Sequence, residues 1–254
     1  MVQIDLRDKT VLLTGASDGI GKATAKFLMK MGAKVAVHYN TNKESADTLV
    51  QNYKETRSRA FKANLSIENE VYTMFEEVEK AFGKIDCVIL NAGVFMQHPI
   101  ANTTADWFST WKRTIDINLN STGLLTKLGI DHFMTHTGGR FIYVGSRAVF
   151  RGETEEYLGY AASKGGMVSL ARSVARSFGK HNIKSFILSP GFTRTQMAES
   201  FIKDHGEEKI LNEIALNELT KPEDLTSIIA LMCSGHMDHA TGATIDMNAG
   251  SHIR

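Results

Sequence analysis

Residues 10–21 read Thr-Val-Leu-Leu-Thr-Gly-Ala-Ser-Asp-Gly-Ile-Gly, and this stretch decides the fold. Its first five residues are apolar or β-branched, which predicts a short strand that stops at the glycines. Apolar residues then recur with helical spacing at Ile20, Ala23, Phe27 and Met31. The stretch is therefore a strand, a glycine turn and a helix in succession.

The same alternation of strand and helix continues to the end of the chain. Residues 87–90 (Cys-Val-Ile-Leu) are apolar at every position, as a parallel strand buried on both faces requires. No linker, repeat or low-complexity tract interrupts the pattern, so we expect an α/β fold: a doubly wound, mostly parallel, Rossmann-type sheet in a single domain, residues 1–254. Strands are expected at 10–14, 34–39, 59–63, 85–90, 141–144, 185–188 and 243–247, and helices at 20–31, 43–55, 68–82, 104–136, 157–179, 196–216 and 222–233.

Composition narrows the class of protein. The 254 residues are 43% hydrophobic and 22% charged, and 29 Lys and Arg against 28 Asp and Glu give a net charge of +1. Without a long block of one sign, neither nucleic acid nor an anionic membrane is an expected partner. Cys87 and Cys233 lack metal-binding spacing and suit a reducing compartment. With no signal pattern and no apolar run of membrane-spanning length, we expect a cytoplasmic protein without a metal.

The glycine turn is the first candidate site. Gly15, Gly19 and Gly21 have the spacing G-x-x-x-G-x-G, which lets the backbone approach a pyrophosphate held at the N-terminus of the following helix. An ordinary tight turn is the alternative. A P-loop is disfavoured, because Ala16 and Ala23 stand where that motif requires Gly and Ser or Thr.

A tyrosine and a lysine form the second candidate site. Tyr160 and Lys164 are four residues apart, so on a helix they share one face. A cation about 4 Å from a phenol contributes roughly 4 kcal/mol at an effective dielectric of about 20. That energy would lower the phenol pKa by roughly 2 to 3 units, so that it could exchange a proton with a carbonyl or alcohol oxygen. Tyr39 and Lys43 have the same spacing, so the pair alone is weak evidence.

Several motifs follow one another along the chain in a fixed order: the glycine turn, Asn91-Ala92-Gly93, Asn118, Ser146, Tyr160 with Lys164, and Pro190-Gly191. This order is far more specific than any one of the motifs. Together they resemble the short-chain dehydrogenase/reductase family in its single-domain form, and within it the 3-oxoacyl-[acyl-carrier-protein] reductases, over essentially the whole chain. The resemblance implies an NAD(P)(H)-dependent oxidoreductase that transfers hydride between nicotinamide and a carbonyl or secondary alcohol.

The resemblance also implies a role for each residue. Tyr160 would be the acid/base, Lys164 would lower its pKa and hold the nicotinamide ribose, Ser146 would fix the substrate oxygen, and Asn118 would hold a water that links Lys164 to solvent. The implied contacts to the cofactor are Gly15, Ser17, Asp18, Gly19, Ile20 and Gly21 at the turn; Tyr39 and Asn40 after the second strand; Asn64 and Leu65 beside the adenine; Asn91, Ala92 and Gly93 after the fourth strand; and Pro190, Gly191, Thr193 and Thr195 near the carboxamide.

The end of the second strand bears on the choice of cofactor. NAD-selective relatives carry an acidic residue there, and its carboxylate would repel a 2′-phosphate. This chain has Tyr39 at that place, followed by Asn40, so NADP(H) is favoured. NAD(H) stays possible, because Asp18 brings a negative charge toward the same region and no Arg fills position 40.

The sequence is compatible with more than one class of substrate. The charged segment 147–156 is expected to line the substrate entrance. The substrate would be a small carbonyl or alcohol compound, and a 3-oxoacyl-thioester reductase and a sugar or polyol dehydrogenase are both compatible. A protein that senses dinucleotide without turnover is the alternative of another class, although it would need only the glycine turn and not Asn118, Ser146, Tyr160 and Lys164 together.

Two further expectations concern the later half of the chain. The segment 196–216 could cap the site as a lid or could be an ordinary amphipathic surface helix. The helices at 104–136 and 157–179 carry more apolar residues than one sheet-covering face needs, which together with the resemblance predicts a homotetramer or dimer. The apolar residues of the lid candidate are Met197, Phe201, Ile202, Ile210, Leu211 and Ile214.

Overall fold

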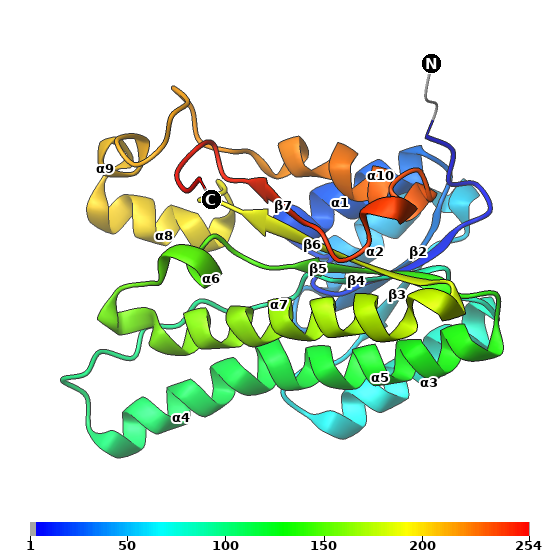
Figure 1. Cartoon of the computed structure of the whole chain (residues 1–254), viewed down its shortest axis with the longest axis horizontal. Coiled ribbons are helices and arrows are strands. Elements are labelled where there is room, and N and C mark those ends of the chain that lie inside the picture. The colour runs from blue at the N-terminus through cyan, green and yellow to red at the C-terminus, as the bar shows by residue number, and fades with distance from the viewer. Residues whose placement is uncertain (1–3, 254) are drawn as a thin grey trace.

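Seven parallel strands form one sheet in the order β3-β2-β1-β4-β5-β6-β7 (Figure 1). This computed structural model describes residues 4–253, apart from the side chains of Met197, Ser200, Phe201, Asp204 and His205. The doubly wound, single-domain α/β fold expected from the sequence is confirmed. The strands are β1 (Thr10–Leu13), β2 (Lys34–Tyr39), β3 (Arg59–Lys62), β4 (Cys87–Leu90), β5 (Gly139–Val144), β6 (Ile183–Pro190) and β7 (Thr244–Met247).

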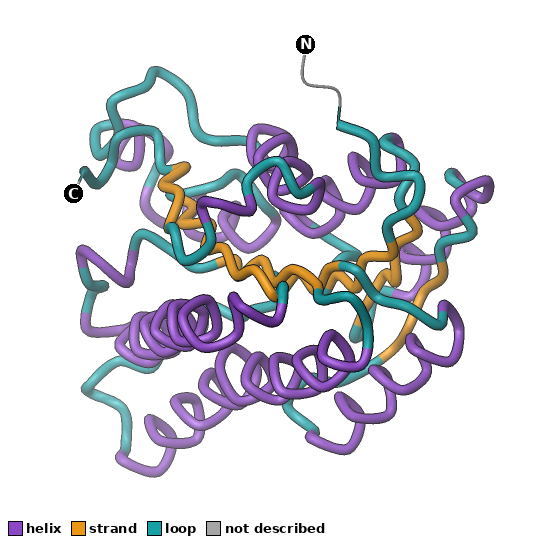
Figure 2. Tube along the Cα trace, turned by 45° about the vertical axis from the view of Figure 1, so that its right-hand side comes forward, coloured by secondary structure: helices purple, strands orange, loops and turns teal. Residues whose placement is uncertain are grey.

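Helices cover both faces of the sheet, which Figure 2 shows edge-on between two helical layers. In the central strands, alternate residues belong to two apolar clusters: Val11 and Leu13 pack on one side, and Leu12 packs on the other. The first cluster includes α1 (Gly19–Lys30), α2 (Lys43–Asn52) and α10 (Thr226–Ser234), and the second includes α3 (Glu68–Phe82), α5 (Ser121–Thr135) and α7 (Leu158–Phe178).

The long helical tract expected at 104–136 contains an irregular turn. It consists of α4 (Thr104–Ile115), a π-helical turn at Asp116–Asn120, and α5. Such one-residue expansions of a helix often lie at functional sites, and this one carries Asn118. The tract is confirmed in its extent, but the π turn has no local sequence signature.

The segment expected to be helical at 196–216 is broken in two. Gly206 has φ of +82° and its N–H bonds to the carbonyl of Ile202, which ends α8 (Gln196–His205). The second helix, α9 (Glu207–Leu211), is short, so the continuous helix over 196–216 is wrong. A further short helix, α6 (Ala148–Arg151), follows β5 where no helix was expected.

The strand order reverses between β1 and β4. Chain connections leave toward β2 and β3 on one side of this point and toward β5, β6 and β7 on the other, which opens a crevice outside the carboxyl ends of the strands. The loops that follow β1, β4, β5 and β6 therefore meet at one edge of the sheet.

Candidate active site

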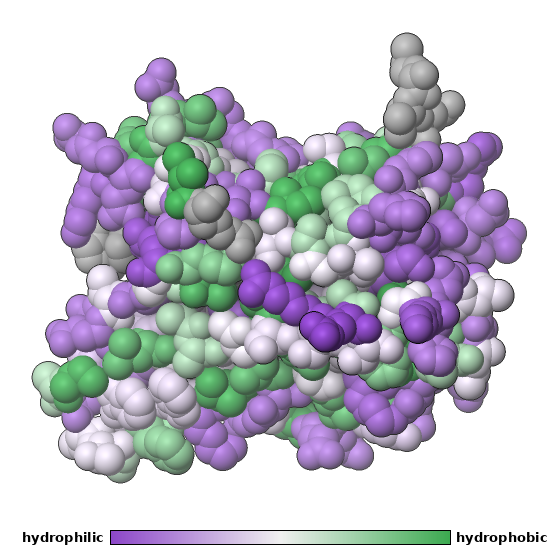
Figure 3. Space-filling model, in the orientation of Figure 1, coloured by the Kyte–Doolittle hydropathy of each residue, from purple (hydrophilic) through white to green (hydrophobic). Residues whose placement is uncertain are grey.

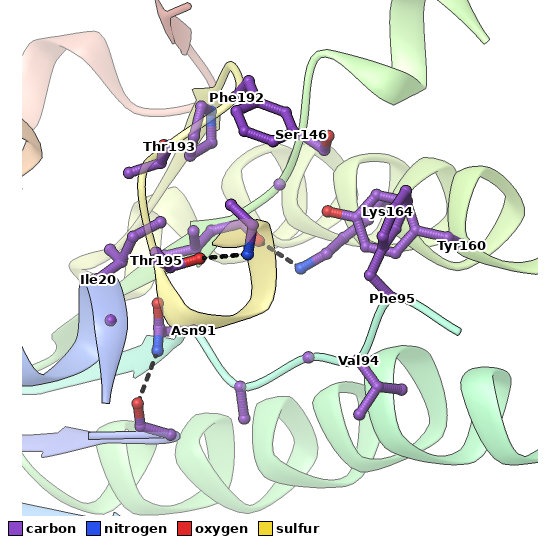
Figure 4. A pocket seen from close by; sticks show the side chains of 18 of the residues that line it. Ile20, Asn91, Val94, Phe95, Ser146, Tyr160, Lys164, Phe192, Thr193 and Thr195 are labelled. Atoms are coloured by element: carbon purple, nitrogen blue, oxygen red, sulfur yellow. Dashed lines mark hydrogen bonds between the residues drawn. The ribbon is translucent and has the colours of Figure 1, made fainter. Parts of the chain in front are cut away.

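A cavity of about 620 Å³ lies at this edge (Figure 4). Ile20, Asn91 and Thr195 border one side of it, and Ser146, Tyr160 and Lys164 lie together on the other. All the site residues named from the sequence line this cavity except Gly21, Tyr39 and Asn118. Residues from seven separate loops and helix ends therefore meet in one space.

The glycine turn approaches the cavity with its backbone. Gly15 and Gly19 have φ of +64° and +50°, the left-handed region that glycine adopts without strain. Asp18 caps α1 by accepting a hydrogen bond from the N–H of Gly19 at 2.7 Å. Gly21 does not line the cavity but packs against the turn, where a Cβ atom would come within 2.0 Å of the carbonyl oxygen of Gly15. Gly21 thus acts by letting the turn and the helix pack together.

His38 holds this turn in place and was not identified from the sequence. The N–H of Gly15 donates to His38 Nδ1 at 2.9 Å, so Nε2 carries the proton and donates to the carbonyl of Ala63 at 3.0 Å. Burial lowers the pKa of His38, which keeps the ring in the neutral form that this pair of bonds requires. The only local signal was a polar residue within the apolar strand at 34–39.

The ends of β1 and β4 are fastened together by Asn91. Its side-chain amide donates to the carbonyls of Thr14 and Gly15 at 2.9 and 3.1 Å. In return, the hydroxyl of Thr14 accepts from the backbone N–H groups of Asn91 and Ala92, both at 3.0 Å. The glycine turn therefore has a fixed position relative to the Asn91-Ala92-Gly93 segment.

Tyr39 does not lie where the resemblance placed it. Its side chain is only 8% exposed and packs in the apolar cluster formed with α1 and α2. Because side chains alternate along a strand, the cavity wall at the end of β2 is made by its neighbours, including Asn40 and Thr41. Any discrimination between cofactors at this strand end falls to these two exposed residues.

Ser146, at the end of β5, and Tyr160, in the first turn of α7, form the chemical centre of the cavity. The hydroxyl of Ser146 accepts from the N–H of Ala148 at 3.1 Å and is hydrogen-bonded to Tyr160, which acts to lower the pKa of the phenol. Phe95 lies edge-on to the Tyr160 ring with centroids 4.7 Å apart, and stacks on Tyr157 at 3.7 Å. These aromatic contacts fix the phenol in one orientation.

Burial is the largest cause of the pKa shifts of both Tyr160 and Lys164. It raises the pKa of Tyr160 to about 12, with the negative charge of Glu153 adding to the rise and Ser146 opposing it. It also lowers the pKa of Lys164 to about 8, and the Nζ of Lys164 donates to the carbonyl of Val144 at 2.7 Å. Burial therefore sets the direction of the Tyr160 shift in the chain alone, and the lowering of that pKa by Lys164 remains a prediction. At neutral pH the phenol is protonated.

Asn118 lies behind the cavity wall and has no exposed surface. Its side-chain nitrogen donates to the carbonyl of Val94 and to the hydroxyl of Ser163, both at 3.0 Å, and its side-chain oxygen accepts from the N–H of Val94 at 2.8 Å. Asn118 thus ties the loop after β4 to α7, one residue before Lys164. This is a positioning role, and the water that the resemblance implied remains a prediction.

The segment after β6 closes over the glycine turn. Thr195 caps α8 by accepting from the N–H of Ala198 at 3.3 Å, and a Cβ on Gly19 would lie 3.1 Å from its methyl group. Ala198, Ile210 and Glu213 line the cavity, so the region of α8 and α9 borders the site. Met197 and Phe201, named for the lid, lie outside the described side chains. Whether the segment moves as a lid remains a prediction.

The residues present fit a dinucleotide. The first turn of α1 offers backbone N–H groups that have no partner within the helix, and the turn before it carries no bulky side chain. The cavity extends from this turn past Asn64 and Leu65 at one end to Tyr160 at the other. One continuous cavity therefore joins the glycine turn to the Tyr160 phenol.

The fold and the cavity, taken with the chain's similarity to known proteins, define its class. The family model described as Enoyl-(Acyl carrier protein) reductase matches residues 15–252. The chain belongs to the short-chain dehydrogenase/reductase family, whose members are NAD(P)-dependent oxidoreductases that act on carbonyl and alcohol groups.

Individual relatives are similar over nearly their whole length. The chain is 29% identical to the 3-oxoacyl-[acyl-carrier-protein] reductase FabG of Staphylococcus aureus over 247 residues, 96% of this chain and 98% of the relative. It is 27% identical to the reductase of the same name from Thermotoga maritima, with the same coverage. A short-chain dehydrogenase from Burkholderia cenocepacia, solved in complex with NADP, superposes with a TM-score of 0.88 at 27% identity and covers 97% of this chain and 98% of its own.

Among the side chains that the structure describes, no group of three His, Cys, Asp or Glu is arranged to hold a metal ion. In the same part of the chain, no helix has both the length and the apolar character needed to cross a membrane.

Proposed function

We propose that this protein uses Tyr160 as the proton donor in the reduction of a carbonyl compound by NADPH. The observation that carries the proposal is the placement of the Tyr160 phenol beside the Ser146 hydroxyl, in the same cavity as the glycine turn. The phenol is protonated at neutral pH, the form that a carbonyl reduction consumes.

Each polar group of the site has a task in this reaction. When bound, the nicotinamide supplies the hydride that the carbonyl carbon gains. Ser146 donates a hydrogen bond to the carbonyl oxygen and aligns it with Tyr160, which gives that oxygen its proton. Lys164 contributes positive charge near the ribose and the phenol as the phenolate forms, and Asn118 keeps α7 and the loop after β4 in register.

The test is a panel assay with the purified protein. Ketones, 3-oxoacyl thioesters and sugars are offered with NADPH, and oxidation of the cofactor is followed by absorbance. The hypothesis that the substrate is a 3-oxoacyl thioester is supported by the FabG relatives at 29% identity. No specific observation favours the oxidation of a sugar or polyol. Cofactor binding without turnover of any compound in the panel would favour the alternative of a dinucleotide-sensing protein.

The preference for NADPH over NADH depends on Asn40. Its exposed side chain lines the cavity after β2, where the chain presents no carboxylate. We expect Asn40→Asp to lower kcat/KM for NADPH by about 10-fold or more, roughly 1.4 kcal/mol, because a carboxylate repels the 2′-phosphate. Steady-state kinetics with both cofactors measures this effect.

The matched variant for this experiment has the opposite charge. Asn40→Arg should raise kcat/KM for NADPH and lower it for NADH, because a guanidinium pairs with phosphate. A wild-type protein already several-fold better with NADH would contradict the preference before either variant is made.

Self-association accounts for the apolar surface of the long helices. Phe108 of α4 is 57% exposed, Met134 of α5 is 47% exposed and Leu158 of α7 is 40% exposed. Figure 3 shows apolar patches among polar ones on the half of the molecule that these helices occupy. We expect a homotetramer or dimer, working in the cytoplasm, and light scattering that reported a monomer at micromolar concentration would contradict this.

A further inference from the structure

Two arginines border the cavity next to the proposed catalytic serine. Arg147 directly follows Ser146 and is 5% exposed, and Arg151 lies one helical turn further along α6. Arg147 Nη2 and Arg151 Nη1 donate to the same oxygen of Glu213, at 3.2 and 3.1 Å. The other terminal nitrogen of Arg147, Nη1, is shielded from solvent and has no hydrogen-bond partner among the described residues.

A buried guanidinium with an unused nitrogen is an unusual arrangement. Buried charged groups are normally paired and hydrogen-bonded, because lost hydration is otherwise not replaced. The backbone N–H of Arg147 donates to the carbonyl of Pro190 at 3.0 Å, so the residue is anchored at both ends. Arg147 is therefore a fixed and incompletely paired cation in the wall of the cavity.

Two carboxylates lie near the arginine pair among the described residues. Glu213, which the two cations share, is 45% exposed in its side chain and can turn toward solvent. The only other acid within ion-pair distance among the described residues is Glu153, 3.8 Å from Arg151, and burial raises the pKa of its carboxyl group. Neither carboxylate bonds to Arg147 Nη1, and the one shared by both arginines, that of Glu213, is the more exposed of the two.

We infer that Arg147, together with Arg151, binds a carboxylate carried by the substrate, so that this protein reduces an oxo acid or oxidises the corresponding hydroxy acid. The inference rests on the proposed function, because it assumes that the carbonyl oxygen lies on Ser146 and Tyr160. The bond between Glu213 and the arginines shows that a carboxylate group fits this place. The negative charge of Glu213 disfavours a phosphate dianion more strongly than a singly charged carboxylate.

A purely structural role for the arginines makes a different prediction. If Arg147 and Arg151 only fasten the segment after α9 through Glu213, then losing either side of this ion pair should have the same effect on every substrate. If they bind the substrate, loss of Arg147 should harm acids alone, and loss of the Glu213 charge should free the cations and leave acids favoured.

The experiment compares each acid with its uncharged ester. Pyruvate, acetoacetate and 4-oxopentanoate are assayed with NADPH beside their methyl esters, so that the separation of carbonyl and carboxylate is scanned. We expect the best acid to exceed its ester in kcat/KM by on the order of 10- to 100-fold, the scale of a charge-assisted hydrogen bond.

The variants assign this discrimination to residues. Arg147→Met should reduce the acid-to-ester ratio by about 10-fold or more, Arg147→Lys should restore part of it, and Glu213→Gln should retain or raise it. Arg194→Met is the matched control, because Arg194 is an exposed arginine paired with Glu207 outside the cavity lining, and its loss changes the net charge equally. This control should keep the wild-type ratio.

Three results would overturn the inference. The first is a wild-type kcat/KM that is higher for esters or 3-oxoacyl thioesters than for every acid. The second is an Arg147→Met variant that loses activity on acids and esters alike. The third is a Glu213→Gln variant whose acid-to-ester ratio falls as far as that of Arg147→Met. If no carbonyl compound is reduced at all, the proposed function fails. The inference is then tested by the binding of oxo acids to the protein. Calorimetric titration of the protein saturated with NADP⁺ should then show oxo-acid binding that Arg147→Met abolishes and Arg194→Met retains, and an absence of binding would refute it.

Discussion

Replacing Tyr160 with Phe should lower kcat for carbonyl reduction by at least about 100-fold, the scale of a positioned proton donor. The variant keeps the ring and its edge-on contact with Phe95 at 4.7 Å, and it removes only the hydroxyl beside Ser146. Folding and the affinity for NADPH should therefore change little. Steady-state kinetics with the best substrate of the panel, together with a fluorescence titration of NADPH, separates the two effects.

Tyr143→Phe is the matched control for Tyr160→Phe. Tyr143 is also a buried phenol, hydrogen-bonded to Thr126 at 3.0 Å, but it lies in the apolar core and not in the cavity lining. Its loss should affect thermal stability and leave kcat within a few-fold of wild type. If Tyr160→Phe retained more than a tenth of wild-type turnover, Tyr160 would not be the acid.

Gly21→Ala should weaken NADPH binding by on the order of 100-fold, the equivalent of about 3 kcal/mol. The added Cβ would lie 2.0 Å from the carbonyl oxygen of Gly15 and 2.6 Å from the amide nitrogen of Asn91. Neither group can yield without displacing the turn, because Gly15 is bonded to His38 and Asn91 is bonded to Thr14. The dissociation constant, measured by fluorescence titration, reports the change.

Gly123→Ala is the control for this substitution. Gly123 lies within α5, and a Cβ there would meet no heavy atom within 4 Å. Alanine in a helix interior is favoured over glycine by roughly 0.5–1 kcal/mol, so this variant should bind NADPH normally and melt no lower than wild type. An affinity for NADPH in Gly21→Ala within three-fold of wild type would show that the packing of the turn is not needed.

The fold was accessible from the sequence because its signals are local. The run at 10–14 and the uniformly apolar residues 87–90 identify buried parallel strands, and the spacing of Ile20, Ala23 and Phe27 identifies the helix that α1 forms. A period of two or 3.6 residues is visible within one segment, so it requires no knowledge of what the segment packs against. The placement of Ser146, Tyr160 and Lys164 in one cavity follows from the same pattern, because loops at the carboxyl ends of parallel strands meet at one edge.

The sequence by itself thus determined the α/β fold, its single parallel sheet and the set of loops that form the site. Only the tertiary structure decided that His38 holds the glycine turn, that Asn40 and not Tyr39 borders the cavity, and that Arg147 meets Glu213, 66 positions away. It also decided that burial raises the pKa of Tyr160. The physical reason is common to all four: burial and long-range contacts depend on which side chains the fold brings together, and neither desolvation nor a partner distant in sequence is encoded in local spacing.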